Sequence, residues 1–382
     1  MQSRRTFAFL WLFLFCLISP FAMTQVYKVT DLGALSPTAI NFWGQVVGNV
    51  NGQAFIWTQF AGLQGLGTLT GGTSSYAASI NDLGVVTGSA DGPGTLVSPY
   101  TAFPNVVCSD LTQPFIWTPR AGMQGLGAPQ NLPDAFLDGS NSSMCNGAAS
   151  YGRGINNLSQ IVGDVPDGPN AYALALLWTR ANGMTAFGST WPPTFGNGIN
   201  NNGEIVGQNS AIACQGHATT WKNGVATDLG NLGGGADGYI SSANGINDLG
   251  VVVGWSTTGP AFPLNSSPVH AILSTQGAAL LDLGTLPGDT SSAASKINFF
   301  GQVIGSSGST DYVCDEFTDS PFEVIGRPFV WSERSGMKDL NTLIPDNSGW
   351  VLKSATGINF WGQIVGSGTL NGQAHGFLLA PR

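Results

Sequence analysis

The chain repeats one short motif seven times, and this repetition constrains the fold more than any other feature. The motif is Ile-Asn, two variable residues, Gly, one variable residue, two positions rich in Val, Ile and Thr, and a final Gly. Its Ile-Asn pairs stand at Ile40-Asn41, Ile80-Asn81, Ile155-Asn156, Ile199-Asn200, Ile246-Asn247, Ile297-Asn298 and Ile358-Asn359. A motif that returns in this way marks a repeat architecture, in which each unit packs against its neighbours.

Each motif predicts a β-hairpin. The residues before Ile-Asn are small or apolar, and those after the first Gly are rich in Val and Ile. Between them, Asn-x-x-Gly fits a type I turn, in which Asn caps the first corner and Gly takes the left-handed conformation. The copy at 156–159 has Ser159 in place of Gly, so we expect this turn to be strained or differently built.

Two further strands are predicted after each hairpin. The third strand ends in Trp in five units, at Trp57, Trp117, Trp178, Trp221 and Trp331, whereas 271–274 and 376–379 have lost it. The fourth carries Leu-Gly or a relic of it, at 65–67, 125–127, 185–188, 228–230, 282–284 and 339–341. Four short strands in each of seven units predict an all-β repeat array and not a two-sheet sandwich.

The two ends of the repeat array complement each other. The last unit stops at the third strand, 376–379, whereas Asp31-Leu32-Gly33 is a fourth strand with no unit in front of it. Because closing a ring removes unpaired strand edges, we expect 27–34 to pair antiparallel with 374–380. The predicted fold is one seven-bladed β-propeller of four-stranded blades over 25–382, closed by its N-terminal strand. A β-solenoid and a ring of another blade number are the alternatives.

These units resemble the HAF family of extracellular repeats, which is named after a His-Ala-Phe at the start of the Trp-bearing strand. The chain has weakened forms of that signature at His217-Ala218, His270-Ala271 and His375-Gly376-Phe377. The resemblance covers nearly the whole chain after residue 24. It implies a bacterial, exported, β-propeller-like repeat protein, and it supplies no catalytic motif.

Export is also predicted from the N-terminal residues. Residues 1–24 combine Arg4-Arg5, an apolar run from Phe7 to Ile18 and a plausible cleavage site before Gln25, which is the order of a signal peptide. The apolar run is short for a membrane-spanning helix, and no second run of about 20 residues follows. We therefore expect a secreted, cell-surface or periplasmic protein without an integral membrane segment, and a monomer.

The charges argue against nucleic acid as a partner. The sequence has 13 Lys and Arg against 22 Asp and Glu, and an acidic surface repels phosphate backbones.

Four cysteines lie beyond the signal peptide: Cys108, Cys145, Cys214 and Cys314. An even number in an exported protein favours disulfides, with Cys108–Cys145 and Cys214–Cys314 as our preferred pairs, and free thiols as the alternative.

Length variation identifies a candidate binding face. The Asn-x-x-Gly turns and the turns between third and fourth strands are short in every unit, whereas the other connections carry insertions at 89–113, 129–150, 255–269 and 306–327. Long loops on a rigid scaffold commonly bind ligands. We predict a ligand site there that includes Tyr100, Asp134, Asp138, Asp311, Tyr312, Asp315, Glu316 and Asp319.

Metal and catalytic chemistry have weak support in the sequence. The acidic residues of these insertions lack the ordered spacing of a calcium loop, so calcium is a candidate without a motif, and no cofactor is predicted. The histidines share one repeat position, and we expect them to form structural hydrogen bonds and not a metal site. The strand-ending Trp residues are expected to pack between blades.

Three functions remain open. The first is a secreted or cell-surface binding module that recognises a carbohydrate, peptide or protein through the face with the long loops. The second is a carbohydrate-active hydrolase or lyase that uses carboxylates on that face, since fold does not determine function. The third is a structural surface protein without a discrete ligand. No nucleophile elbow, phosphate-binding loop or zinc-hydrolase motif is present, so an enzyme is the less favoured class.

Overall fold

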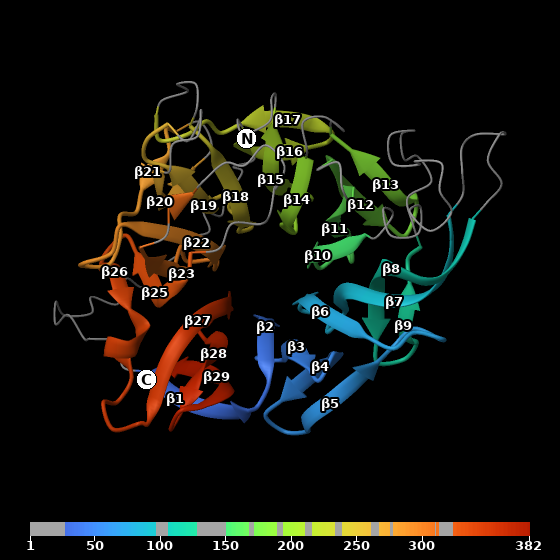
Figure 1. Ribbon diagram of the computed structural model, residues 1–382, viewed down its shortest axis with the longest axis horizontal. Coiled ribbons are helices and arrows are strands. Elements are labelled where there is room, and N and C mark those ends of the chain that lie inside the picture. Colours follow the sequence, from blue (N-terminus) through green and yellow to red (C-terminus); the bar gives the residue numbers. More distant parts are fainter. Residues whose placement is uncertain are drawn as a thin grey trace, which may run out of the picture.

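The chain forms a ring of seven antiparallel sheets (Figure 1). The computed structural model describes residues 27–96, 106–127, 150–167, 172–188, 194–210, 216–233, 239–260, 267–275, 278–309, 311–312 and 324–382. Each sheet is one blade, and its first strand lies nearest the axis of the ring (Figure 1). The prediction of a seven-bladed β-propeller is therefore confirmed.

The blades are numbered in chain order, with the strands of each given from the axis outward. Blade 1 contains β2 (Ser36–Ile40), β3 (Val46–Val50), β4 (Gln53–Thr58) and β5 (Gly62–Gly67). Blade 2 contains β6 (Ser75–Ile80), β7 (Val86–Leu96), β8 (Val106–Thr118) and β9 (Gly122–Gly125). Blade 3 contains β10 (Tyr151–Ile155), β11 (Ile161–Asp167), β12 (Tyr172–Thr179) and β13 (Gly183–Phe187). Blade 4 contains β14 (Thr194–Ile199), β15 (Ile205–Ser210), β16 (Gly216–Lys222) and β17 (Val225–Asp228).

The remaining three blades follow the same plan. Blade 5 contains β18 (Ser241–Ile246), β19 (Val252–Thr257), β20 (Ser267–Ser274) and β21 (Leu281–Asp282). Blade 6 contains β22 (Ser291–Ile297), β23 (Val303–Gly308), β25 (Gly326–Ser332) and β26 (Gly336–Asp339), followed by the 3-10 turn η2 (Leu340–Leu343). Blade 7 contains β27 (Trp350–Ile358), β28 (Ile364–Leu370), β29 (Gln373–Pro381) and, on its outer edge, β1 (Tyr27–Gly33).

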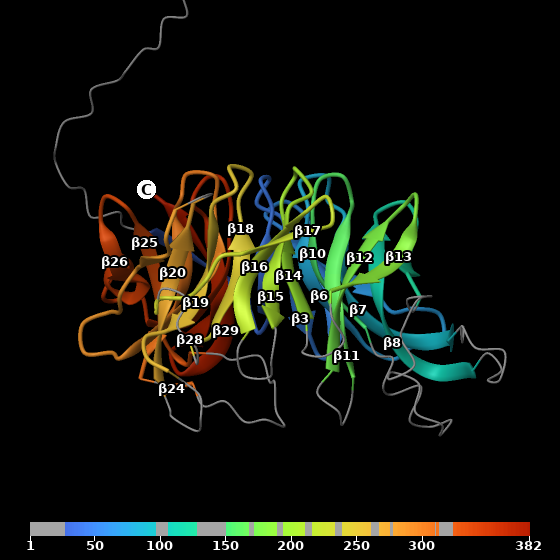
Figure 2. The ribbon, with the colours of Figure 1, turned by 90° about the horizontal axis from the view of Figure 1, so that it is seen from above.

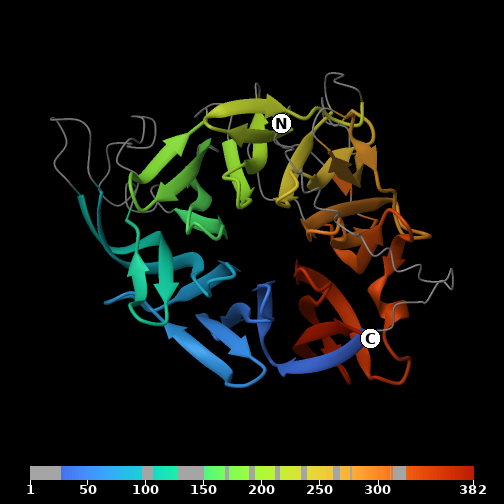
Figure 3. The ribbon, with the colours of Figure 1, turned by 180° about the vertical axis from the view of Figure 1, so that it is seen from behind.

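Strand β1 closes the ring. It pairs antiparallel with β29 in a register that runs from Tyr27 opposite Pro381 to Gly33 opposite Gly376. Figure 3 shows β1, in blue, along the outer side of the red blade 7. Tyr27 is fully buried and Leu32 is nearly so, and both contribute to hydrophobic clusters around blade 7. The predicted pairing of the two ends of the array is confirmed.

The two faces of the disc differ as predicted. We call the side with the Ile-Asn-x-x-Gly turns the turn face, and the opposite side the insert face. Figure 2 shows the turns at the top, while the far end of the β7–β8 hairpin and the short strand β24 (Asp311–Tyr312) lie below. β24 comes from the insertion of blade 6 and pairs with β20, so blade 5 has five strands instead of the expected four.

The final Gly of each motif is required by a close approach of two strands. In blade 2, a Cβ atom on Gly88 would lie 1.8 Å from the carbonyl oxygen of Tyr76 on the neighbouring inner strand. Gly88 also lies opposite Phe115, and the equivalent Gly residues of blades 1, 6 and 7 likewise lie opposite Phe55, Phe329 and Phe377. All four rings are fully buried. The repeated Gly and Phe therefore form one packing unit.

The strand-ending Trp residues pack in the core, as predicted. Trp221 of blade 4 joins a cluster with Val162 of blade 3, and its ring centroid lies 5.5 Å from that of Phe187. Trp117 of blade 2 belongs to a cluster that includes Val47 of blade 1. The described Trp clusters thus bury apolar surface between adjacent blades, which holds the ring together.

The Asn of each motif links its blade to the next. As expected, its side-chain oxygen caps the turn, since Asn41 Oδ1 accepts the N–H groups of Trp43 and Gln45. In addition, each Asn Nδ2 donates to the main-chain oxygen of the equivalent Asn in the following blade, at 2.9–3.2 Å, including Asn359 to Asn41. These bonds form a closed circle of seven buried asparagines. The sequence predicted the cap but not the circle.

Ser159 adopts the same left-handed conformation as the Gly it replaces. Its φ is 58°, compared with 75° at Gly84, and the turn keeps the same hydrogen bond, from Ser159 N to Asn156 O. The turn is therefore strained and not differently built. Left-handed backbone destabilises a non-Gly residue by about 1 kcal/mol. We expect Ser159→Gly to stabilise the protein by about that amount, measured by urea unfolding, and Ser159→Ala to give no such gain.

Candidate binding site in the central channel

A β-bulge in every inner strand places one extra residue beside the axis. The register of each inner strand shifts just before its Ile-Asn pair. Such a shift leaves one residue unpaired and redirects its side chain. The seven extra residues are Thr38, Ala78, Arg153, Asn197, Asn244, Ser295 and Thr356, and all seven line one cavity.

This cavity has a volume of about 530 Å³ and lies toward the insert face. Its lining includes Tyr76 and Tyr151, which stand at the ends of inner strands farthest from the turns. Ser306 and Val324, near the two ends of one long insertion, also line it. A narrower space of about 160 Å³, lined by the Ile residues of all seven motifs, continues toward the turn face.

Most of the extra residues are fixed by bonds between blades. Thr38 Oγ1 donates to the main-chain oxygen of Ala77, and Asn244 Nδ2 donates to that of Ala294. Asn197, Ser295 and Thr356 make the same contact with the next blade. The cavity therefore has a rigid polar rim, which suits the recognition of polar ligands.

Arg153 has a different role, because it turns toward a buried carboxylate of its own blade. Its Nε and Nη2 groups donate to the two oxygens of Asp164 in β11, and Asp164 is 1% exposed. Burial is the largest single effect and lowers the pKa of Arg153, but the charge of Asp164 and its hydrogen bonds, with smaller contributions from Tyr151 and Tyr76, together outweigh burial and raise that pKa. The guanidinium thus stays charged while about a third of its side chain faces the channel.

Lys296 places a second cation in the channel. It occupies the position just before the motif Ile, where the other blades have only Ala, Ser or Gly, and it lines both spaces. Enclosure by the inner strands lowers the pKa of Lys296, and the positive charge of Arg153 lowers it further. Among the described residues, no carboxylate forms an ion pair with it.

The channel is therefore a cationic pocket in an acidic protein. Arg153 and Lys296 contribute two positive charges, Asp164 compensates one of them, and no described residue that lines the cavity is acidic. Lys296 is half-buried and forms no ion pair with a described carboxylate, so a bound anion would compensate its charge. Carboxylate, sulfate and phosphate groups match this arrangement, with the tyrosines and amides available for hydrogen bonds.

The predicted ligand residues lie mostly outside the described residues. This holds for Tyr100, Asp134, Asp138, Asp315, Glu316 and Asp319, and for Cys145, Cys214 and Cys314. Asp311 and Tyr312 form β24, and Cys108 lies within β8. The predicted disulfides and the predicted acidic site thus remain predictions, as does the signal peptide over 1–24. No group of three or more His, Cys, Asp and Glu able to hold a metal occurs among the described residues.

Each histidine pairs with an aspartate of the fourth strand, which confirms a structural role. His217, His270 and His375 place Nδ1 2.8 Å from Asp228, Asp282 and Asp31. Burial is the largest single effect and raises the pKa of Asp282, but the hydrogen bonds from His270 and from the N–H of Gly284, with the electrostatic attraction of His270, together outweigh burial and lower that pKa. In the three blades without a basic residue at this position, the aspartate is replaced by Gly65, Gly125 or Ala186. The pairs therefore fasten third strands to fourth strands.

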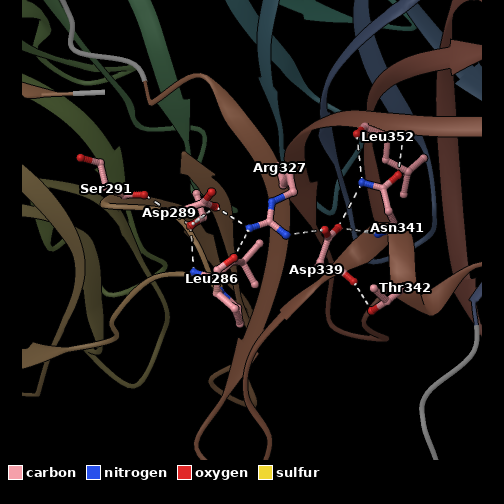
Figure 4. A network of polar contacts seen from close by, with 10 residues as sticks. Leu286, Asp289, Ser291, Arg327, Asp339, Asn341, Thr342 and Leu352 are labelled. Carbon is pink, nitrogen blue, oxygen red and sulfur yellow. Dashed lines mark hydrogen bonds and ion pairs between the residues drawn. The ribbon is translucent and has the colours of Figure 1, made fainter. Parts of the chain in front are cut away.

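In blade 6, Arg327 takes the place of the histidine. Figure 4 shows its guanidinium between Asp339 of β26 and Asp289, at 3.3 and 2.9 Å. Asp339 also accepts hydrogen bonds from Asn341, whose side-chain oxygen accepts the N–H of Leu352 in blade 7 (Figure 4). In blade 6, the residue at the histidine position therefore belongs to a hydrogen-bond network that reaches blade 7 through Asn341.

Arg153 and Lys296 were missed by the sequence analysis. Their signal is a departure from the repeat, because one long cation replaces a short side chain at each of two positions that are otherwise small or uncharged. Knowledge of the bulge is needed to place these positions beside the axis.

No helix in the described part of the chain is long and apolar enough to span a membrane.

Three solved structures are similar to this chain at low sequence identity. An oligogalacturonate lyase in complex with manganese has 10% identity and a TM-score of 0.49, over 94% of both chains. A gluconolactonase from Xanthomonas campestris has 8% identity and a TM-score of 0.41, over 94% of this chain and 91% of its own. The β-propeller domain of the trilobed protease from Pyrococcus furiosus has 9% identity and a TM-score of 0.44, over 93% of this chain and 95% of its own.

Such low similarity gives no information on ligand or activity, so the propeller assignment rests on the strand pairing. No family model and no curated protein matches this chain, and the HAF resemblance stays a prediction.

Proposed function

We propose that the protein is an exported binding module that takes an anionic ligand into the central channel from the insert face. The observation that carries the proposal is Lys296, an enclosed cation that lines the cavity beside Arg153 and has no carboxylate partner among the described residues. A ligand carboxylate, sulfate or phosphate would supply the missing charge. The polar rim and the two tyrosines would then orient the rest of the ligand.

Binding is favoured over carboxylate-dependent hydrolysis at this site. Glycoside hydrolysis requires two carboxyl groups on either side of the reacting bond. The described lining of the cavity contains no Asp or Glu, and Asp164 behind it is engaged by Arg153. The described channel therefore offers cations for recognition but no acid–base pair.

Substitution of Lys296 tests the proposal. A panel of citrate, glucuronate, and sulfated and phosphorylated sugars is titrated against the protein by calorimetry. Lys296→Met is expected to weaken binding of the anionic ligand by about tenfold or more, because a charge-assisted hydrogen bond is lost. Since the substitution also removes an enclosed charge, the protein should unfold at the same or higher urea concentration.

The affinity for the anionic ligand should depend on pH in a definite direction. Only protonated Lys296 attracts the anion, and the pKa of Lys296 is lowered. Affinity for the anion should therefore fall as the pH rises through this lowered pKa, which is a lower pH than the one at which an ordinary lysine loses its proton. Lys296→Arg should bind without this fall. Lys353→Met, which removes an exposed lysine on β27, is the control of equal charge. Equal affinity of Lys296→Met and parent for every anion would refute the proposal.

A further inference from the structure

An arc of aromatic side chains crosses three adjacent blades on the turn face, opposite the cavity. It consists of the two variable residues of the turns in blades 6, 7 and 1: Phe299, Phe300, Phe360, Trp361, Phe42 and Trp43. The rings contact one another across the blades, with centroids 5.7 Å apart for Phe299–Phe360 and 5.3 Å for Phe42–Phe360. They form one continuous surface.

The arc is exposed but held in place. Trp43 is 70% exposed and Trp361 is 58% exposed. The Nε1 of Trp43 donates to the main-chain oxygen of Asp82 at 2.9 Å, and the Nε1 of Trp361 donates to that of Phe42 at 3.1 Å. Each indole N–H thus forms a hydrogen bond with the neighbouring blade, which fixes the orientation of the ring. Fixed aromatic rings lose little conformational entropy on binding, which makes them effective anchors.

A carboxylate stands beyond each end of the arc. Asp82 of blade 2 accepts the main-chain N–H of Phe42, and Asp248 of blade 5 accepts that of Asn201, at 2.9 Å in both cases. Neither forms an ion pair with a described residue. None of the seven Asn-x-x-Gly or Asn-x-x-Ser turns contains Lys, Arg or His. The surface combines exposed rings with uncompensated negative charge.

We infer that the turn face docks a basic polypeptide segment, in which Lys or Arg residues alternate with aromatic or aliphatic ones. The apolar residues would pack on the arc, and the cations would lie over the rings and beside Asp82 and Asp248. A second copy of this chain fits less well, because two such faces would bring their carboxylates together in molecules that each carry a net charge of −9. This docking surface is separate from the channel site.

Peptide arrays test the inference on the protein of residues 25–382. One array alternates Lys or Arg with Trp or Leu, and a matched array replaces every Lys and Arg by Gln. We expect the basic peptides to bind about tenfold more tightly than their Gln partners at low salt, with the difference shrinking at high salt. Trp43→Ala combined with Trp361→Ala should weaken binding about tenfold or more.

Matched variants separate this surface from general charge attraction. Asp82→Asn with Asp248→Asn should weaken peptide binding by about threefold or more. Glu333→Gln with Asp346→Asn removes the same charge from exposed sites outside the Asn-x-x-Gly turns and should leave the affinity within about twofold of the parent. Phe60→Ala removes a fully exposed ring in the β4–β5 turn and should also have little effect.

Three results would overturn the inference. The first is equal binding of the basic and Gln peptides. The second is loss of cellohexaose or chitohexaose binding, without any effect on peptides, in the Trp variant. The third is a dimer of the parent protein in solution that the Trp variant abolishes.

Discussion

A chain that begins at Leu35 is expected to lose about 5 kcal/mol or more of stability and to aggregate, compared with the chain of residues 25–382. Removal of β1 exposes the whole edge of β29 that pairs with residues 27–33. It also removes the buried side chains of Tyr27 and Leu32, each worth about 1.5–3 kcal/mol of burial. An unpaired edge of this length promotes pairing with other molecules. Urea unfolding and light scattering measure the two effects.

A circular permutant is the matched control. Tyr27 lies opposite Pro381, so Arg382 followed by an added Asn-Gly makes a three-residue turn that can lead back into Tyr27 as a β-hairpin. A chain that runs from Leu35 to Arg382 and then through this turn into 27–34 contains β1 in its native place. It should be as stable as the chain of residues 25–382. If the chain lacking β1 were equally stable and monomeric, β1 would not stabilise the protein by closing the ring.

The fold was predictable because the repeat and its ends are visible in the sequence. Seven Ile-Asn motifs give the number of blades, and the unmatched strand at Asp31-Leu32-Gly33 gives the closure. The fifth strand of blade 5 was not predictable, because β24 is two residues long and pairs with a blade other than its own. The circle of asparagines was missed for a related reason, since one turn considered alone shows only the cap.

The candidate site was predicted in outline but not in its residues. Long insertions pointed to the end of the channel toward which the cavity lies, and Ser306 and Val324, near the two ends of one insertion, line the cavity. Arg153 and Lys296, however, lie in inner strands that otherwise follow the repeat. Their exposure to the channel depends on the bulges in β10 and β22, which a pattern of alternating residues does not reveal. The aromatic arc was missed because uniformly short turns suggested a face without function.

The circle of asparagines leads to the second large expected effect, on stability. Asn359 is 4% exposed and joins blade 7 to blade 1. Its Nδ2 donates to Asn41 O and to Gln363 Oε1, and its Oδ1 accepts the N–H groups of Trp361 and Gln363. Asn359→Ala removes all four bonds and leaves buried polar groups without partners. We expect a loss of about 3 kcal/mol or more, measured by urea unfolding.

Asn359→Asp distinguishes the cap from the link between blades. An ionised Asp can still accept the two N–H groups, but it cannot donate to Asn41 O and would face that oxygen with a negative charge. Its folded-state pKa should therefore be raised, so the variant should be destabilised at pH 7 and recover as pH falls through that pKa, when a protonated carboxyl can donate. Asn202→Ala, at an exposed turn position that contacts the next blade at Asp248 O, should lose less than about 1 kcal/mol. Equal losses for Asn202→Ala and Asn359→Ala, with no recovery of Asn359→Asp in acid, would show that the circle does not hold the ring together.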